Sequence, residues 1–215
     1  MIFKGIIFDL DGTILNSTQL NIDAFYHTCD IHLNKRIDEK ELLKMYGRPL
    51  IEQMKYFSAD KADDMICTYR DYSHKHHDDR VSLFPGVNDL LFKLYHSQAI
   101  VGLVTSKTRG FAERALNLFK IKDFFDHLIF CEDVTLHKPD PEGYEKMIKL
   151  MGLPPSAVLS VGDSPFDILG SKRAGLTTVL VGWTTFPLEE FSNCLPDYMI
   201  NDFNSLLKLF SSKKL

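Results

Sequence analysis

Asp9 and Asp11 are the residues whose types and spacing most directly suggest chemistry. They follow an apolar run, including Ile6, Ile7 and Phe8, that is typical of a strand buried on both faces inside a parallel sheet. In an extended chain, residues i and i+2 face the same side, so both carboxylates would share one small volume. Because like charges repel, such a pair is expected where a cation or a proton transfer uses it. The sequence therefore suggests an acidic functional site directly after the first strand.

Gly12 follows this pair and would let the chain turn where a side chain would obstruct a ligand. An Asp-Gly dipeptide is also typical of a β-hairpin turn. The hairpin interpretation is the weaker one here, because polar residues of matching chemistry recur after later predicted strands.

These later polar residues follow strands expected over residues 100–104 and 158–161, or precede a helix expected from Pro141. Ligands of parallel α/β sheets bind where the carboxyl ends of the strands meet, so we expect the side chains to lie together at that edge. The residues concerned are Thr105, Ser106, Lys138, Asp163 and Asp167. Each has an ordinary alternative: a helix cap for the hydroxyls, a solvated loop position for Lys138, and a turn for Asp163.

Phosphoryl transfer suits this set better than other common reactions. Asp9 would attack phosphorus and form an aspartyl-phosphate, which divides one difficult step into two. Asp11 would protonate the leaving oxygen and then deprotonate the attacking water. Lys138, with the hydroxyl of Thr105 or Ser106, would hold the remaining phosphoryl oxygens.

Magnesium is the cofactor that this oxygen-rich set predicts, since Mg²⁺ prefers oxygen ligands and one or two carboxylates. The carboxylates of Asp9 and Asp163 would bind the ion, together with the backbone carbonyl of Asp11. Asp167 would contact the metal through water or orient Lys138. The ion would offset the repulsion between the attacking carboxylate and the anionic phosphate.

The elements needed to position these residues follow from an alternation of apolar runs and helical patterns. Strands are expected over residues 100–104, 128–131, 158–161, 177–181 and 198–200, separated by helices over 88–96, 109–119, 141–151 and 165–174, with a last helix over 204–210. Such alternation is typical of a doubly wound parallel α/β sheet. Asp140 is expected to cap the helix that starts at Pro141.

The segment between about Ser17 and Arg80 departs from this alternation, because it reads as helical throughout. Helices are expected over residues 18–29, 39–46, 51–57 and 60–77. We therefore expect an α/β catalytic core formed by residues 1–16 and 82–215, with an α-helical cap formed by residues 17–81.

Composition narrows the class of protein. A net charge of −4 and a pI near 6.0 give no electrostatic reason to expect nucleic acid or a membrane surface as partner. No apolar run approaches the length of a membrane span, and the first residues do not resemble a secretion signal. Four widely separated cysteines without a Cys-x-x-Cys pair favour reduced thiols in a cytoplasmic protein.

The chain resembles the haloacid dehalogenase superfamily of phosphatases over nearly its whole length. The resemblance is carried by four motifs: Asp9-Leu10-Asp11-Gly12-Thr13, Val104-Thr105-Ser106, Lys138-Pro139-Asp140-Pro141, and Gly162-Asp163-Ser164-Pro165-Phe166-Asp167. Glu132-Asp133-Val134 and Gly182-Trp183 resemble the phosphoglycolate phosphatase and pyrophosphatase group in particular.

The resemblance implies a Rossmann-like core with a small helical cap after the first strand. It implies Asp9 as nucleophile, Asp11 as acid and base, and Thr105 or Ser106 with Lys138 as phosphate ligands. It also implies magnesium held by Asp9, Asp11 and Asp163. Asn16 departs from the pattern, since relatives frequently carry an aspartate there, and this removes one charged contact between core and cap.

The function predicted first is magnesium-dependent hydrolysis of a small phosphorylated metabolite, as in phosphoglycolate phosphatases. Two alternative functions stay open: an inorganic pyrophosphatase and a phosphomutase of the β-phosphoglucomutase type. Sugar phosphates and nucleotides stay open as substrates. Dehalogenation is disfavoured, because it needs neither the acid at Asp11 nor magnesium ligands. A binding module without activity is also disfavoured, because the acidic residues are intact.

Two further features lie outside the core motifs. Arg48, within Gly47-Arg48-Pro49 of the cap, could contact a second anionic group of the substrate, although a solvated arginine is as good an interpretation. The run from His74 to His77 suggests a metal site, but a solvated helix end is favoured, since adjacent helical residues point in different directions.

Overall fold

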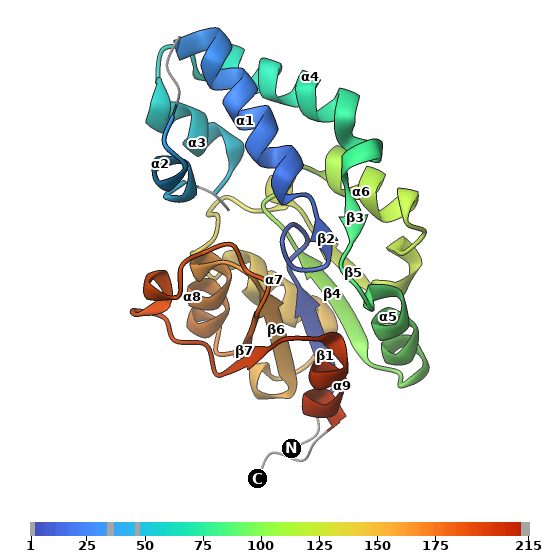
Figure 1. Ribbon diagram of the computed structural model, residues 1–215. Helices are drawn as coiled ribbons and strands as arrows, with labels where there is room; N and C mark the ends of the chain where they lie inside the picture. Colours follow the sequence, from blue (N-terminus) through green and yellow to red (C-terminus); the bar gives the residue numbers. More distant parts are fainter. Residues whose placement is uncertain (1–2, 34–36, 46–47, 212–215) are drawn as a thin grey trace. The chain divides into compact units, whose positions relative to one another are not determined.

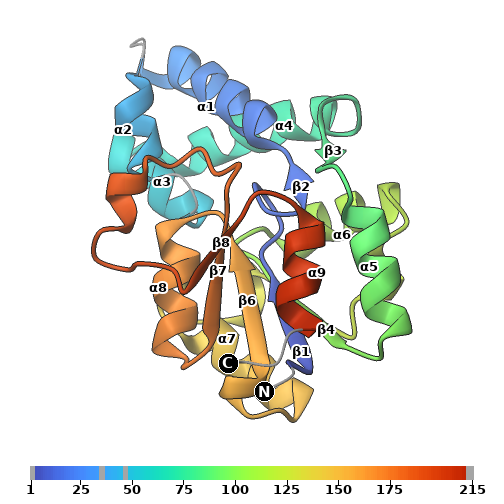
Figure 2. The ribbon, with the colours of Figure 1, turned by 60° about the horizontal axis from the view of Figure 1, so that its bottom comes forward.

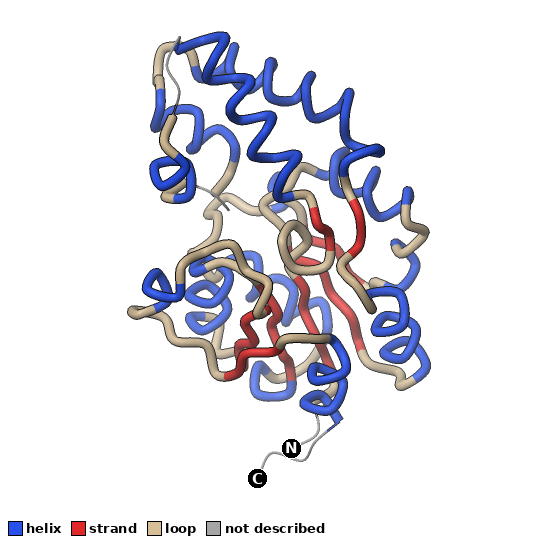
Figure 3. The backbone as a smooth tube through the Cα atoms, viewed as in Figure 1, coloured by secondary structure: helices blue, strands red, loops and turns tan. Residues whose placement is uncertain are grey.

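The computed structural model describes residues 3–33, 37–45 and 48–211 (Figure 1). The chain forms two compact units, one built from Met1–Leu15 with Leu83–Leu215 and the other from Asn16–Ser82. Unit 1 contains the large sheet and unit 2 is helical, as the colouring of Figure 3 makes plain.

Unit 1 is built on a six-stranded sheet in which every neighbouring pair is parallel. In spatial order the strands are β5 (His127–Ile129), β4 (Ile100–Val104), β1 (Gly5–Phe8), β6 (Val158–Gly162), β7 (Thr177–Val181) and β8 (Tyr198–Ile200). The predicted parallel α/β class is confirmed.

The register of the central strands decides where the functional residues meet. Phe8 at the end of β1 pairs with Leu103 of β4 on one side and with Val161 of β6 on the other. The three strands therefore end at nearly the same level, and the loops that begin at Asp9, Thr105 and Asp163 leave the sheet side by side. All residues of β1, β6 and β7 are buried, which explains why these strands read as continuous apolar runs.

Helices follow the strands as expected. They are α5 (Val87–His96), α6 (Arg109–Leu118), α7 (Glu142–Met151), α8 (Pro165–Arg173) and α9 (Phe203–Ser211), with short 3₁₀ turns η1 (Lys122–Phe124), η2 (Cys131–Asp133), η3 (Pro155–Ala157) and η4 (Leu188–Phe191). Helix α7 packs against β4 and β5, and α8 packs against β6 and β7. Helices α5 and α9 lie side by side (Figure 2); α5 also contacts β4, and α9 also contacts β8.

The predicted start of α7 is wrong by one residue. Pro141 is the N-cap instead of the first helical residue, and the helix begins at Glu142. The carboxylate of Asp140 nevertheless accepts a hydrogen bond from the Glu142 N–H across 3.0 Å, so it satisfies one of the free donors of the first turn.

Close packing of α7 on the sheet depends on Gly102 of β4. A Cβ at this position would lie 2.5 Å from Sδ of Met147 and 2.8 Å from Cε of Met151, so a side chain here would require both methionines to move. Met147 and Met151 join Ile7 and Val104 in a buried cluster. Burial of one such side chain stabilises the fold by about 1.5–3 kcal/mol.

Unit 2 contains α1 (Thr18–Leu33), α2 (Glu39–Leu43), α3 (Leu50–Phe57) and α4 (Ala62–Arg80). Helix α4 packs against α1 and α3, and buried apolar side chains of the four helices form one cluster. Its members include Phe25, Cys29, Leu42, Met54 and Met65. Unit 2 therefore has a hydrophobic core of its own.

Two short strands of the structure were not predicted from the sequence. β2 (Leu15–Asn16) and β3 (Ser82–Leu83) form a two-stranded sheet where the chain passes between the units. Strands of two residues are too short to show the alternation on which strand prediction depends.

Among the residues that the structure describes, no helix has the length and apolar character needed to cross a bilayer. None of the four cysteines forms a disulfide in the described part of the chain; Cys29 and Cys194 are buried, Cys131 is half-buried and Cys67 is exposed.

Candidate active site

Asp9, directly after β1, lies in a buried ion-pair network with Lys138 and Asp167. The ammonium of Lys138 donates to Oδ1 of Asp9 across 2.7 Å and to Oδ1 of Asp167 across 2.6 Å. Its third bond, of 2.7 Å, goes to the carbonyl oxygen of Val104 at the end of β4. An ammonium has three donors, so Lys138 is fully used. Contact with a phosphoryl oxygen would replace one of these bonds.

The loop before α7 presents Lys138 because its backbone is anchored. The carboxylate of Glu142 accepts hydrogen bonds from the N–H groups of Thr135 and Leu136, and Arg173 donates to the carbonyl oxygen of Pro139. These contacts hold both ends of the segment that carries the lysine.

Asp167 is positioned by the first turn of α8. Ser164 is the N-cap: its hydroxyl accepts from the N–H of Asp167, while Oδ2 of Asp167 accepts from both the N–H and the hydroxyl of Ser164. This reciprocal arrangement is a capping box. Oδ1 of Asp167 accepts from Lys138 and, across 3.2 Å, from the phenol of Tyr144. Both carboxylate oxygens of Asp167 are therefore engaged, which favours the orienting role over metal contact.

Asp163 completes a cluster in which carboxylate oxygens of Asp9, Asp163 and Asp167 lie within 4.8 Å of one another. All three side chains are buried or nearly so. The Asp163 carboxylate is less occupied than that of Asp167, since the Thr13 hydroxyl donates to its Oδ1 across 3.4 Å, a long contact. Three carboxylates thus share one ammonium.

The pKa values reflect this imbalance. Burial raises the pKa of Asp9 to about 7, although Lys138 acts in the opposite direction. Burial, then the neighbouring Asp167 and Asp9, raise the pKa of Asp163 well above its ordinary value. Burial alone would lower the pKa of Lys138, but the carboxylates of Asp167 and Asp9 outweigh it and raise that pKa. Ionised Asp9 and Asp163 together call for a further positive charge.

Magnesium fits this donor set. Asp9 and Asp163 offer neighbouring carboxylate oxygens in a buried cluster with excess negative charge, and oxygen ligands are what Mg²⁺ prefers. The resemblance also implied Asp11 around the ion, and the sequence reasoning assigned that contact to its backbone carbonyl oxygen; this role stays a prediction. The carboxylate of Asp11 is paired with Lys107.

The hydroxyl residues follow β4 as predicted. The N–H of Thr105 donates to the carbonyl of Ile129, and its hydroxyl oxygen accepts from the N–H of Lys107 across 3.1 Å. The hydroxyl hydrogen of Thr105 is thus available to an oxygen ligand. Thr105 is buried and Ser106 is half-buried.

Two residues of this site were missed by sequence reasoning. Lys107 donates to both carboxylate oxygens of Asp11, across 2.8 and 3.0 Å. Its position directly after Thr105-Ser106 was the available signal, because it places a cation at the same sheet edge. Tyr144, buried in α7, bonds Asp167, but nothing in its helical pattern distinguished it from an apolar core residue.

Arg48 belongs to unit 2, where its guanidinium contacts Glu52 across 3.4 Å. Gly47 of the same motif lies outside the described residues. The role suggested for Arg48 stays a prediction.

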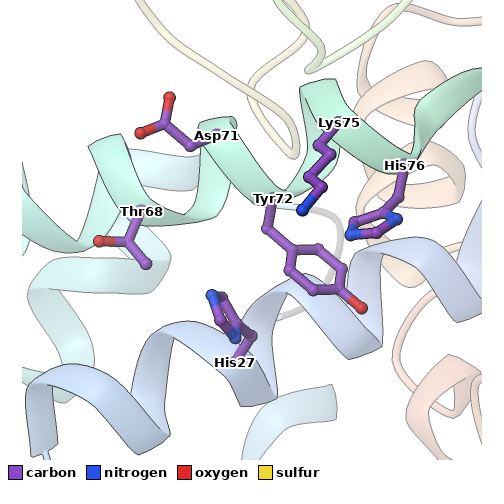
Figure 4. A pocket seen from close by; sticks show the side chains of 6 residues that line it. All are labelled: His27, Thr68, Asp71, Tyr72, Lys75 and His76. Carbon is purple, nitrogen blue, oxygen red and sulfur yellow. The ribbon is translucent and has the colours of Figure 1, made fainter.

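The interpretation of residues 74–77 as a solvated helix end is wrong for His77. This side chain is buried, and its Nδ1 lies 2.7 Å from Oδ1 of Asp78. His76 instead stacks on Tyr72, whose ring also lies 4.8 Å from that of His27 of α1. Figure 4 shows these three rings in a shallow pocket of unit 2 lined by His27, Thr68, Asp71, Tyr72, Lys75 and His76.

Fold and site together define a hydrolase of one family: the chain belongs to the haloacid dehalogenase-like hydrolases, whose profile matches residues 6–181. It is 39% identical over 209 residues to a provisionally named pyrophosphatase PpaX of Caldanaerobacter subterraneus, covering 97% of this chain and 95% of that protein. It is 33% identical over 213 residues to pyrophosphatase PpaX of Halalkalibacterium halodurans, covering 99% of each. A haloacid dehalogenase-like hydrolase from Streptococcus pneumoniae superposes with a TM-score of 0.83 at 25% identity, covering 97% of this chain and 98% of that structure.

Proposed function

We propose that this protein is a magnesium-dependent phosphohydrolase that cleaves a small phosphorylated substrate through an aspartyl-phosphate on Asp9. The observation that carries the proposal is the buried Asp9 carboxylate, held by Lys138 through Oδ1 and flanked by Asp163, at the edge where the hydroxyls of Thr105 and Ser106 also emerge. This is the donor set that phosphoryl transfer requires.

The reaction would proceed in two steps. A carboxylate oxygen of Asp9 forms a bond to phosphorus while the bond to the leaving oxygen breaks, and Asp11 supplies the proton that the leaving oxygen takes up. Water then attacks the phosphorus of the aspartyl-phosphate, Asp11 accepts its proton, and inorganic phosphate departs. Asp9 is returned as a carboxylate.

The carboxylates of Asp9 and Asp163, with the backbone carbonyl of Asp11, would hold Mg²⁺. When bound, the ion supplies positive charge that offsets repulsion between a carboxylate nucleophile and an anionic phosphate. Lys138 keeps Asp9 oriented and, with the Thr105 or Ser106 hydroxyl, would bind phosphoryl oxygens. Asp167 fixes Lys138.

Inorganic pyrophosphate is the substrate proposed first, because two relatives aligned over nearly the whole chain are named pyrophosphatases. Phosphoglycolate, a phosphoric monoester, is the comparison substrate. Residues 1–16 with 82–215 are proposed as the catalytic core and residues 17–81 as a helical cap, in which Arg48 would contact a second anionic group. Cysteines without disulfides suit a reducing compartment such as the cytoplasm.

Phosphate release from a panel of substrates tests the proposal. The panel contains pyrophosphate, phosphoglycolate, sugar phosphates, nucleotides and p-nitrophenyl phosphate, each with Mg²⁺ and after chelation. We expect hydrolysis that chelation abolishes and Mg²⁺ restores. Asp9→Asn should lose turnover with every substrate while keeping the fold, whereas His76→Ala, in unit 2, should keep both activity and metal dependence.

Three results would contradict the proposal. Wild-type protein that releases no phosphate from any member would favour a binding module. Turnover that requires a sugar bisphosphate and releases little phosphate would identify a phosphomutase. Asp9→Asn with more than a few per cent of wild-type activity would remove the nucleophile from its assigned place.

A further inference from the structure

Lys107 makes a mostly buried contact with Asp11 that the proposed reaction leaves without a role. The ammonium donates to both carboxylate oxygens of Asp11, and the two side chains are only 15% and 23% exposed. By contrast, the surface pair Lys93–Asp89 joins side chains that are 49% and 60% exposed. Such exposed pairs contribute little to stability or order.

The loop that carries Lys107 is held by its own backbone. The N–H of Lys107 donates to the Thr105 hydroxyl, and its carbonyl oxygen accepts from the N–H of Cys131 across 3.1 Å. Arg109, two residues after Lys107 and the first residue of α6, donates its N–H to the carboxylate of Glu132. The base of the Lys107 side chain is therefore fixed on both sides.

The Asp11 loop and the Lys107 loop are neighbours because β1 and β4 pair in register, Phe8 opposite Leu103. Asp9 and Asp11 are thus bonded by different lysines at this edge. Lys138 bonds Asp9, and Lys107 bonds Asp11. A cation that bonds both oxygens of a carboxylate restricts its rotation as well as its position.

We propose that Lys107 is a positioning residue that orients the Asp11 carboxyl group toward the leaving oxygen of the substrate. The inference rests on the proposed function and adds a residue to it. A proton donor acts only when its oxygen lies within hydrogen-bond reach of the leaving oxygen, and small misplacement is costly. Lys107 acts through Asp11 and does not itself touch the reacting atoms.

The leaving group provides the test. An alkoxide departs only with a proton, whereas p-nitrophenolate departs without one, so only the first reaction depends on a well-oriented Asp11. The quantity to compare is kcat/KM, because it reports the step in which the leaving group departs even when breakdown of the aspartyl-phosphate limits kcat. The substrates are p-nitrophenyl phosphate and the best alkyl phosphate of the panel above.

Lys107→Met should lower kcat/KM for the alkyl phosphate on the order of 10- to 100-fold, and for p-nitrophenyl phosphate by less than about threefold. Lys107→Arg, which keeps a cation with several donors, should recover most of the alkyl phosphate activity. Lys93→Met is the matched surface control and should leave both substrates unchanged. In an Asp11→Asn background, Lys107→Met should cause no further loss, since the two residues act as one unit.

Equal losses for both substrates would overturn the inference and make Lys107 a substrate ligand. No loss for either substrate would make the ion pair a bystander. An additive loss in the double variant would show that Lys107 does not act through Asp11. These outcomes are separable from failure of the proposed function, in which wild type is inactive with both substrates or Asp9→Asn remains active.

Discussion

Replacement of Gly12 by alanine should lower the stability of unit 1 and weaken the Mg²⁺ binding that we propose for Asp163. Gly12 has a φ of +79°, and a Cβ there would lie 2.6 Å from Cγ of Asp163. The left-handed backbone conformation costs an L-residue about 1–2 kcal/mol. Forcing a methyl group into a packed site typically costs a further 1–3 kcal/mol or so. We therefore expect Gly12→Ala to lower the free energy of unfolding by about 2–5 kcal/mol.

Two other glycines separate these contributions. Gly152 has a φ of +63°, but a Cβ there would have no neighbouring atom within 4 Å, so Gly152→Ala should lose only the backbone contribution of about 1–2 kcal/mol. Gly110, inside α6, has nothing within 4 Å and no positive φ. Gly110→Ala should stabilise the helix by about 0.5–1 kcal/mol, because alanine loses less conformational entropy.

Fluorescence of the single tryptophan is the assay for unit 1. Trp183 follows β7 and packs against Phe84 and Phe203, with ring centroids 5.3 and 5.0 Å apart. Its emission during thermal unfolding should show a midpoint that falls by about 2–4 °C for each kcal/mol lost. Because Gly12→Ala displaces a carboxylate proposed to hold Mg²⁺, half-saturation by Mg²⁺ should rise by about tenfold or more, whereas Gly152→Ala should leave it unchanged.

Equal destabilisation by Gly12→Ala and Gly152→Ala would refute the predicted clash between a Cβ at position 12 and Asp163. An unchanged Mg²⁺ concentration for half-saturation in Gly12→Ala would refute it as well. Either result would mean that Asp163 does not depend on the space above Gly12.

Two further predictions concern Lys138 and the loop that carries it. Lys138→Met should lower kcat/KM by about 100-fold or more and destabilise unit 1 by about 3–5 kcal/mol, since it leaves buried carboxylates unpaired. Lys93→Met is the control. Comparable phosphate release by both variants would contradict the role of Lys138 as a phosphate ligand. Hydrogen bonds from Lys146 and the Leu136 N–H lower the pKa of Glu142 to about 2 from the ordinary 4.5. The stability that Glu142 contributes should therefore be complete above about pH 4.5 and be lost as the pH falls toward 2. In urea unfolding, the free energies of unfolding of Glu142→Gln and wild type should differ near neutral pH and become equal in acid. A difference that does not change with pH would refute this prediction.

Much of the core was predictable because the relevant signals are local. The apolar run before Asp9, the run at residues 158–161 and the helical patterns between them define parallel strands, and parallel strands bring their carboxyl ends to one edge. Lys138 bonds Asp9, and a carboxylate oxygen of Asp163 lies within 4.8 Å of one of Asp9, although Lys138 and Asp163 belong to separate loops. The boundaries were less accurate, as Pro141 shows, because a cap depends on hydrogen bonds that residue type alone does not settle.

Other features lay beyond local patterns. The burial of His77 depends on the tertiary packing of α4, and residues 74–77 show no apolar period that would reveal it. Lys107 was missed because a long, flexible side chain in a polar loop has no preferred partner until the neighbouring strand is in place. Asp167 was expected to contact the metal through water or to orient Lys138. Only the hydrogen bonds of its two carboxylate oxygens, Oδ1 with Lys138 and Oδ2 with Ser164, distinguish between these roles.

The sequence by itself determined the fold class, the order of strands and helices, and the acids, hydroxyls and cation that stand at the strand ends, because these follow from short-range periodicity and from the geometry of parallel sheets. Only the tertiary structure decided which charge pairs with which. Lys138 serves Asp9 and Asp167, Lys107 serves Asp11, and Asp163 is left with a long contact to Thr13. Electrostatic interactions depend on distance and on the exclusion of water, and both are set by packing between segments far apart in the chain.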